Sequence, residues 1–302
     1  MSFHDNVERL KKENNILLIA HNYQIGDIQD AADYVGDSFG LARRVSDMDT
    51  PNVVFCGVDF MAESAVILNP EKRIIHPEPK ARCPMAAMVD LDRLKIFRKD
   101  NPDAAVVSYV NTNVETKALS DICCTSSNAV KVVNSLEEEK VLFLPDRNLG
   151  DYIRRYVKDK EIETWQGYCG THDKISVQDV LSLKELYPDA EVIVHPECRP
   201  EVVDMADHVG STAGILKHTV ESPSKRFIIG TEVEMGHRLR LSSPSKEFYF
   251  PGNPLCSNMK MITKEKVIAS MESLEPVVTV DEELMKKARI PLERMIEVGR
   301  GD

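Results

Sequence analysis

The sequence contains the same pattern three times, and this internal repeat limits the folds that the chain can adopt. Three hexapeptides, separated by 88 and then 86 residues, align without a gap: 18–23, 106–111 and 192–197. The same two offsets bring Asp33 into register with Asp121 and Asp207. Core packing explains shared apolar positions, but it does not require a shared aspartate. The repeat therefore indicates three copies of one structural unit.

Each unit alternates short apolar runs with helical patterns. In the first unit, the runs at 16–20 and 53–55 flank a helical pattern at 39–45, and the pattern at 213–218 is its counterpart in the third unit. Strands separated by helical crossovers pair in parallel, with helices on both faces of the sheet. We therefore predict an α/β fold of three three-layer αβα domains with short parallel sheets. A pseudo-threefold axis relates them, and the active site lies at their central interface.

The predicted domains are residues 1–86 with an N-terminal helix, residues 87–173, and residues 174–302 with a C-terminal closing helix. Pro291 is expected to split the segment from Asp281 to Asp302, because proline interrupts helices. The apolar residues after it could dock as an amphipathic helix: Leu292, Met295 and Ile296.

The charge balance narrows the classes of partner. The chain of 302 residues has 38 basic and 49 acidic side chains, a net charge of −11, and no stripe rich in Lys or Arg. Such a surface repels nucleic-acid phosphates and anionic lipids. The first 13 residues are charged, and the longest apolar runs are too short to span a bilayer. We expect a cytoplasmic protein that binds neither nucleic acid nor membranes.

One cysteine recurs after the third short run of each unit. These residues are Cys83, Cys169 and Cys256, and they are spaced like the repeat itself. Around a pseudo-threefold axis, equivalent side chains can converge on one point. Three thiolates suit an iron–sulfur cluster or zinc, and they leave one metal position open as a Lewis acid. The alternative, that all three are small buried core residues, fits their loop positions beside Pro84, Gly170 and Ser257 less well.

The remaining cysteines lack this register. The chain has seven cysteines, an odd number without a secretory signal, which indicates reduced thiols rather than disulfides. We expect Cys56 in an apolar strand, Cys123 and Cys124 in a helix-to-turn segment, and Cys198 outside the metal site.

Polar pairs follow the first strand of each unit. The pairs are His21 and Tyr23, Tyr109 and Asn111, and His195 and Glu197. Ligands of parallel α/β sheets bind beyond the carboxyl ends of the strands, and residues two apart point the same way. Six groups could therefore line one cavity. Histidine can bind carboxylates or transfer protons, tyrosine can act as an acid or base when its pKa is lowered, and Glu197 is the single carboxylate.

Hydroxyl residues precede a helix in each unit: Ser38, Ser126 and Thr212. Free N–H groups at helix starts attract anions, so these residues are expected to cap the helices and to help bind an anionic small molecule. His172, three residues after Cys169, either faces the same cavity or lies at the surface.

With these motifs, the sequence resembles the quinolinate synthase family across essentially its whole length. The motifs are His21-Asn22-Tyr23-Gln24, Gly36-Asp37-Ser38, Tyr109-Val110-Asn111-Thr112, His195-Pro196-Glu197-Cys198, Gly210-Ser211-Thr212 and Gly230-Thr231-Glu232, with the three recurring cysteines. The resemblance implies one oxygen-sensitive 4Fe-4S cluster on these cysteines, with one iron that lacks a protein ligand. It also implies that iminoaspartate condenses with dihydroxyacetone phosphate to give quinolinate, phosphate and two waters in de novo NAD biosynthesis. An aspartate oxidase or aspartate dehydrogenase would supply the iminoaspartate.

The resemblance further implies roles for individual residues. Tyr23 becomes the acid or base for isomerisation and ring formation, and Glu197 the base for dehydration. Tyr109 and Asn111 would orient the intermediate beside the free iron, a Lewis acid. The other implied substrate-binding residues are His21, Ser38, Ser126, His195, Ser211 and Thr212, and His172 is a further candidate. Some relatives carry Cys-x-x-Cys at the last ligand, whereas 256–259 has one thiol, so no redox switch is expected there.

Two other functions stay open on the sequence. A zinc- or cluster-dependent hydro-lyase or aldolase could use the same cavity. An iron–sulfur electron carrier or redox sensor is the non-enzymatic alternative. However, an electron carrier normally holds its cluster with four thiolates and does not need six polar groups at strand ends.

Overall fold

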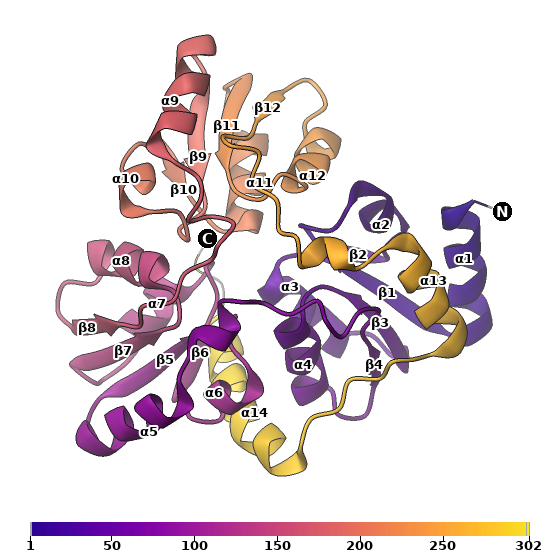
Figure 1. Cartoon of the computed structure of the whole chain (residues 1–302), viewed down its shortest axis with the longest axis horizontal. Coiled ribbons are helices and arrows are strands. Elements are labelled where there is room, and N and C mark those ends of the chain that lie inside the picture. The colour runs from indigo at the N-terminus through magenta and orange to yellow at the C-terminus, as the bar shows by residue number, and fades with distance from the viewer. Residues whose placement is uncertain (1, 300, 302) are drawn as a thin grey trace.

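The computed structural model describes residues 2–299 and residue 301, and it has three α/β units around a common centre (Figure 1). The first unit contains β1 (Ile16–His21), β2 (Tyr34–Gly36), β3 (Asn52–Cys56) and β4 (Arg73–Ile75). The second contains β5 (Ala105–Tyr109), β6 (Ile122–Cys124), β7 (Lys140–Leu144) and β8 (Glu161–Thr164). The third contains β9 (Glu191–Val194), β10 (His208–Val209), β11 (Arg226–Gly230) and β12 (Glu247–Tyr249).

The three sheets share one topology. Their strand orders are β2-β1-β3-β4, β6-β5-β7-β8 and β10-β9-β11-β12, and every pairing is parallel. The central strands are buried because helices cover both faces, which is typical of parallel sheets. The predicted α/β class and the three αβα units are confirmed.

Helices connect the strands in each unit. The first unit has α1 (Phe3–Asn14), α2 (Gly26–Ala31), α3 (Ser38–Ser46) and α4 (Asp59–Leu68). The second has α5 (Leu91–Asp100), α6 (Val114–Lys117), α7 (Ala129–Asn134) and α8 (Arg147–Tyr156), and a 3-10 turn at Ala86–Met88 precedes it. The third has α9 (Val177–Leu186), α10 (Pro200–Val203), α11 (Thr212–Glu221) and α12 (Met235–Ser242), and a 3-10 turn at Met259–Met261 follows it.

The repeated aspartate directly precedes the short edge strand of each sheet. Asp33 accepts a hydrogen bond from the backbone N–H of Leu18 at 2.8 Å and returns one from its own N–H to the Leu18 carbonyl, also at 2.8 Å. Asp121 and Asp207 make the same two bonds with Val106 and Val192. The shared polar position therefore reflects how the edge strand joins the sheet.

These edge strands correct two expectations from the sequence. The apolar runs predicted three strands per unit, whereas β2, β6 and β10 add a fourth. Cys123 and Cys124 lie in β6 rather than in a helix-to-turn segment, and both are fully buried. A strand of two or three residues is too short to show an alternating pattern, which explains the error.

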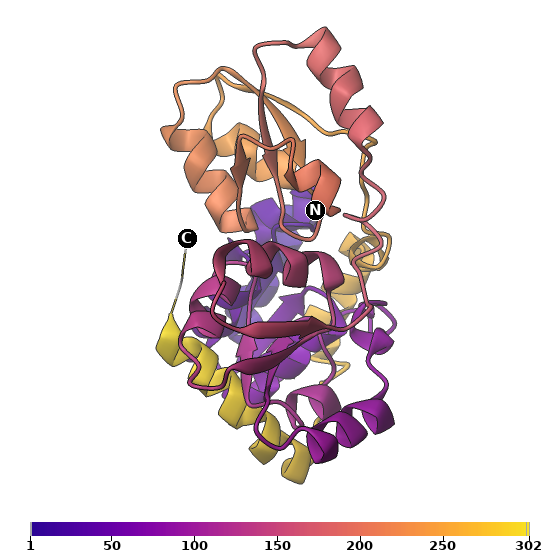
Figure 2. The same cartoon turned by 90° about the vertical axis from the view of Figure 1, so that its left-hand side faces the viewer.

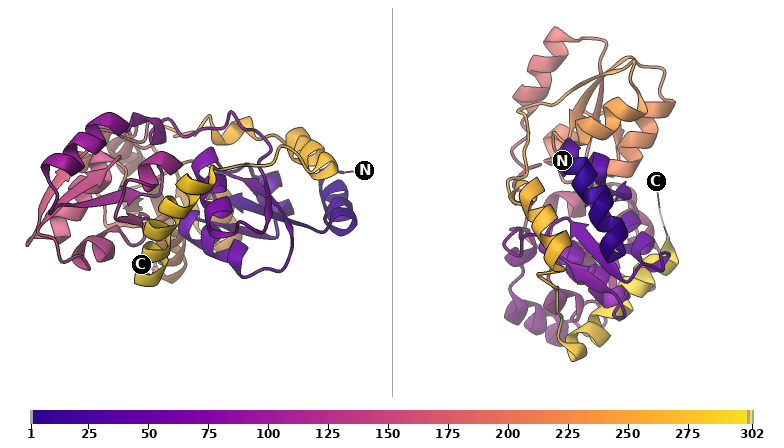
Figure 3. Two further views of the ribbon diagram at one scale, coloured as in Figure 1. Left: turned by 90° about the horizontal axis from the view of Figure 1, so that it is seen from below. Right: turned by 90° about the vertical axis from the view of Figure 1, so that its right-hand side faces the viewer.

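The last two helices pack on units that precede them in the chain. The helix α13 (Lys264–Ser273) lies against α1, and α14 (Glu282–Val298) contacts α4 of the first unit and α6 and β6 of the second (Figures 2 and 3). The expected split at Pro291 is wrong, because α14 is one helix with Pro291 inside it. Ala288, Leu292 and Met295 are fully buried, and this burial offsets the roughly 3 kcal/mol cost of an internal proline.

The largest apolar core draws on all three units, including the buried rings of Phe55, Phe143 and Phe227. In the described part of the chain, none of the helices has the length and apolar character that crossing a bilayer requires.

Candidate functional site

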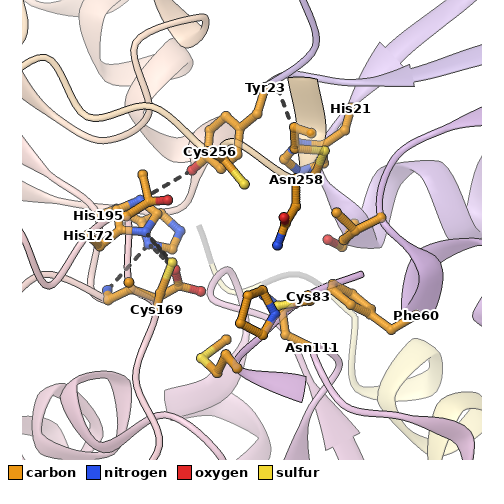
Figure 4. Close-up of a pocket in the computed structure, with 18 of the residues that line it drawn as sticks. His21, Tyr23, Phe60, Cys83, Asn111, Cys169, His172, His195, Cys256 and Asn258 are labelled. Atoms are coloured by element: carbon orange, nitrogen blue, oxygen red, sulfur yellow. Dashed lines mark hydrogen bonds and ion pairs between the residues drawn. The ribbon is translucent and has the colours of Figure 1, made fainter. Parts of the chain in front are cut away.

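A cavity of about 320 Å³ lies between the three units. Nearly all the predicted site residues line it: His21, Tyr23, Ser38, Cys83, Tyr109, Asn111, Ser126, Cys169, His172, His195, Glu197, Thr212 and Cys256. The three cysteines come from three different loops around one space (Figure 4). Ser211 is the predicted site residue that does not line the cavity. It caps α11 instead, where its Oγ accepts a hydrogen bond from Gly214 N at 3.1 Å.

The helix starts differ by one or two residues from the expectation. Asp37 caps α3 through a 2.7 Å bond from Gly40 N, and Ser38 is the first helical residue. Thr212 is likewise the first residue of α11, after its cap Ser211. Ser126 lies in the turn before α7, whose N-cap residue is Asn128. Because none of the three predicted hydroxyl residues serves as the cap, their side chains can face the cavity.

Side chains of different units meet at the cavity wall. The Tyr23 hydroxyl lies 2.7 Å from Thr231 Oγ1 and 3.4 Å from His172 Nε2. His195 Nε2 lies 3.1 Å from Ser126 Oγ, which joins the third unit to the second. Sequence reasoning placed Thr231 in a motif but gave it no role, although this fully buried hydroxyl also lies 2.9 Å from His172 Nε2. Its position directly after β11 is the signal that could have indicated it.

His172 is buried in this cavity rather than exposed at the surface. Its Nδ1 lies 2.7 Å from Glu197 Oε2 and 3.2 Å from Cys169 Sγ. The ligand atoms of Cys169, His172 and Glu197 all lie within 4.8 Å of one another, close enough to hold one metal ion. The carboxylate of Glu197 is thus beside both a cysteine ligand candidate and an imidazole.

Burial keeps the two strand-end histidines neutral. It lowers the pKa of His21 to about 4 and that of His195 to about 3, although nearby carboxylates oppose the shift. A neutral imidazole binds a carboxylate through one N–H donor and can accept a proton that a substrate releases. The two histidines therefore offer hydrogen bonds to an anion without a permanent charge.

Burial has the opposite consequence for the acidic groups of the cavity. Burial and the charge of Glu197 raise the pKa of Tyr23 and of Tyr109 far above their ordinary value, so both phenols keep their protons. Burial alone would raise the pKa of Glu197 as well. The adjacent His172 and a hydrogen bond from Tyr109 reverse that effect and hold the pKa of Glu197 below its usual range. The cavity thus contains one carboxylate and two phenol donors.

The three cavity cysteines fit a cluster of soft metals. Burial raises the pKa of all three thiols, that of Cys83 to about 12. All three side chains line the one cavity between the units. Three converging thiols that resist ionisation need a bound cation to become thiolates, which is what iron or zinc supplies.

The other four cysteines are not among the residues that line the cavity. Cys56 is in β3 as expected, Cys123 and Cys124 are in β6, and Cys198 donates a hydrogen bond to the Gly230 carbonyl at 3.2 Å. All four are fully buried.

Comparison with known proteins gives one consistent result. Residues 5–297 match the family described as Quinolinate synthetase A protein (NadA). A relative from Dehalococcoides mccartyi (strain CBDB1) named Quinolinate synthase is 49% identical over 293 residues, 97% of each chain. Relatives of the same name from Methanoregula boonei and Aquifex aeolicus are 47% and 44% identical, and the alignments cover 97% of this chain and 97% and 92% of those chains.

Proposed function

Because the chain belongs to the quinolinate synthetase A family, we propose that it condenses iminoaspartate with dihydroxyacetone phosphate to quinolinate. Phosphate and two waters leave in this reaction, which serves NAD biosynthesis. The observation that carries the proposal is the joint lining of one cavity by three cysteines and by polar groups from all three units. That lining combines a soft-metal site with donors for an anionic substrate.

In the proposed site, the substrate anions are bound by neutral donors. His21 and His195 offer N–H groups to the substrate carboxylates, and Ser38, Ser126 and Thr212 offer hydroxyls to carboxylate or phosphate. Ser211 supports this set by capping α11 directly before Thr212.

We assign proton transfer in the reaction to Tyr23 and Glu197. Tyr23 is protonated, so we assign it first as the acid for isomerisation and ring closure, with Thr231 and His172 positioned to restore its proton. Glu197 is ionised and is assigned as the base for dehydration. His172 holds its Oε2 at 2.7 Å and can share the proton that Glu197 removes. Tyr109, which hydrogen-bonds Glu197, and Asn111 orient the substrate in the same cavity.

Cys83, Cys169 and Cys256 would hold one 4Fe-4S cluster in this proposal. Such a cluster, with one iron that lacks a protein ligand, supplies a Lewis acid. The soft donor set and the position of all three thiols on one cavity support this cofactor.

The decisive experiment is an anaerobic assay of the reconstituted protein with iminoaspartate and dihydroxyacetone phosphate. The expected result is quinolinate in equal amount to released phosphate. Purified protein should be brown, with broad visible absorption and about four irons per chain. A cluster-loaded protein that forms no quinolinate would refute the proposed reaction.

A second candidate is a zinc-dependent hydro-lyase or aldolase, which the grouping of Cys169, His172 and Glu197 favours. One ion bound there would have three protein ligands, each of a type that zinc accepts, and a fourth position open as in catalytic zinc sites. A colourless protein with one zinc per chain would establish this alternative. Substitution of Cys83 separates the two, because it removes a cluster ligand but leaves the mixed site intact.

We place the reaction in the cytoplasm, where reduced thiols persist. The aspartate oxidase or aspartate dehydrogenase that would supply iminoaspartate is proposed as a functional partner, because an imine hydrolyses in water and must be used soon after it forms.

A further inference from the structure

Each cysteine loop is attached to a carboxylate at or just before the start of a helix in its own unit. The backbone N–H of Cys83 donates to Asp59 Oδ1 at 3.0 Å. The N–H of Cys169 donates to Asp146 Oδ2 at 3.2 Å, and that of Cys256 donates to Glu232 Oε1 at 3.1 Å. The three carboxylates follow β3, β7 and β11 in turn, so the same contact occurs three times.

A second hydrogen bond fixes each loop at the same place. The carbonyl two residues before each cysteine accepts a backbone N–H from the helix start. The pairs are Asp59 N to Ala81 O at 3.0 Å, Arg147 N to Gly167 O at 2.8 Å, and Val233 N to Pro254 O at 2.8 Å. Two hydrogen bonds therefore fix each loop, one at the cysteine N–H and one at the carbonyl two residues before it.

Two of these carboxylates are buried and act only as acceptors. Asp146 and Glu232 are both fully buried. Asp146 Oδ1 accepts from Asn148 N at 2.8 Å and Leu149 N at 2.9 Å, and its Oδ2 accepts from Cys169 N. Both oxygens of Asp146 are thus used as acceptors of backbone N–H bonds.

Glu232 uses both oxygens in a similar way. Its Oε1 accepts from Cys256 N and from Lys260 Nζ, the latter at 2.7 Å, and its Oε2 accepts from Glu234 N at 2.8 Å. Asp59 differs, because a single oxygen, Oδ1, accepts from both Phe60 N at 2.9 Å and Cys83 N.

Helix capping alone does not account for this arrangement. Asp90 caps α5 with the same pair of bonds, to Asp92 N at 3.0 Å and Arg93 N at 3.1 Å, and has no cysteine partner. Burying a carboxylate costs stability unless its hydrogen bonds compensate. Since a carboxylate accepts the cysteine N–H in each of the three units, these residues share a task at the cysteines.

We propose that Asp59, Asp146 and Glu232 are positioning residues that hold the three cysteine ligands for the metal cluster. This inference rests on the cluster assigned under the proposed function. By accepting the cysteine N–H, each carboxylate fixes the loop so that the sulfur enters the cavity. It also keeps that N–H from bonding to a cluster sulfur.

The second effect has an electrostatic consequence. N–H bonds to sulfur raise the reduction potential of an iron–sulfur cluster. Because each carboxylate takes up the cysteine N–H, the three contacts favour the oxidised cluster, which suits Lewis-acid chemistry better than electron transfer.

The test compares amide variants of the carboxylates in cluster-loaded protein. In Asp146→Asn, the amide oxygen can still cap α8, but its NH₂ group then opposes the Cys169 N–H. In Glu232→Gln, the NH₂ group opposes the N–H of either Cys256 or Glu234, because each oxygen of Glu232 accepts one of them. The first outcome releases the Cys256 N–H, and the second disturbs the turn whose Val233 N–H holds the Pro254 carbonyl. Asp59→Asn keeps both bonds, since one oxygen accepts them, and Asp90→Asn is the control with a cap but no cysteine.

The readouts are the rate of iron loss to a chelator, the cluster midpoint potential, and the far-UV spectrum after cluster removal. Loss of a residue that orients a metal ligand typically weakens metal binding about 10- to 100-fold. We expect Asp146→Asn and Glu232→Gln to lose iron at least tenfold faster than wild type, with a higher midpoint potential. Asp59→Asn keeps the Cys83 bond, so its iron loss should change by less than about threefold with a wild-type potential, and Asp90→Asn should match wild type in both.

The inference is overturned if Asp146→Asn and Glu232→Gln release iron at the wild-type rate, or if Asp90→Asn is equally labile. If one of the two variants gives no folded protein, the other carries the comparison because the residues belong to different units. Wild-type protein that never acquires a cluster would instead contradict the proposed function.

Discussion

At the residue scale, burial decides which groups of the cavity carry charge. His21 and His195 are neutral because their pKa values fall to about 4 and about 3, and Tyr23 keeps its proton because its pKa rises. Glu197 remains ionised between two imidazoles. The sequence suggested tyrosine as an acid or base with a lowered pKa, whereas the buried position makes it a proton donor.

Replacement of Glu197 by glutamine tests the assigned base. Glu197→Gln keeps the shape of the side chain but cannot take a proton, so quinolinate formation should fall at least about 100-fold. The visible spectrum of the cluster should be unchanged, because the three cysteines remain. The control is Glu201→Gln, an exposed position four residues later. A fully active Glu197→Gln protein would assign the base elsewhere and leave the metal site unaffected.

Removal of the Tyr23 hydroxyl tests the assigned acid. Tyr23→Phe keeps the packed ring and removes only the group that lies 2.7 Å from Thr231 Oγ1. We expect the rate to fall about 100-fold with little change in the affinity for either substrate, since neutral donors elsewhere bind the anions. Tyr156→Phe, at a position 59% exposed, should have wild-type kinetics. A raised KM with an unchanged kcat would make Tyr23 a binding residue instead.

The site residues that recur at the repeat spacing could be predicted from the sequence, but the residues that hold them in position could not. The spacing of Cys83, Cys169 and Cys256 is visible in one chain, and so are the polar pairs at the strand ends. The repeat does not predict the three carboxylates that support the cysteines, because Asp59 lies one position out of register with Asp146 and Glu232. The role of Thr231 could not be predicted, because the function of a single buried hydroxyl depends on which side chains surround it in space.

At the element scale, short strands depend on polar contacts that hydrophobic patterns do not reveal. The three edge strands exist because an aspartate exchanges two hydrogen bonds with the adjacent strand. The length and burial of β1, β5 and β9 could be predicted from apolar runs. The edge strands, and the unbroken course of α14 through Pro291, could not, because they depend on tertiary contacts.

A buried histidine between two strand ends makes stability depend on pH. His76 follows β4, and its Nε2 bonds the Gly57 carbonyl after β3 at 2.7 Å. Burial lowers the pKa of His76 in the folded protein. Below the unfolded pKa of about 6.5, the unfolded chain takes up a proton that the folded chain does not. The stability present above that pH is therefore lost as the pH falls toward the folded pKa.

The measurement is urea unfolding of anaerobic protein at several pH values between 5.5 and 7.5. Below pH 6.5, wild type should lose up to about 1.4 kcal/mol per pH unit more than His76→Gln, which keeps an N–H donor but cannot ionise. Parallel pH profiles for the two proteins would show that another group controls the dependence.

At the scale of the whole molecule, the site exists only while the three units hold their relative positions. The cysteines belong to separate loops, and His195 of the third unit reaches Ser126 of the second. The helix α14 lies across the first two units, where it contacts α4 on one and α6 and β6 on the other. Its packing therefore influences the distance between Cys83 and the ligands that follow it.

This coupling predicts that a core substitution in α14 affects the distant metal site. Leu292 is fully buried, so Leu292→Ala should cost about 2–5 kcal/mol of stability, while Ile290→Ala, at a position 59% exposed on the same helix, should stay within about 0.5 kcal/mol of wild type. Thermal unfolding should be followed at the same time by far-UV circular dichroism and by visible absorption of the cluster. In Leu292→Ala, both transitions should move to lower temperature together, because the units that present Cys83 and Cys169 separate as α14 loosens. If the helices unfold early while the cluster absorption persists to the wild-type temperature, the cysteines do not depend on this helix for their placement.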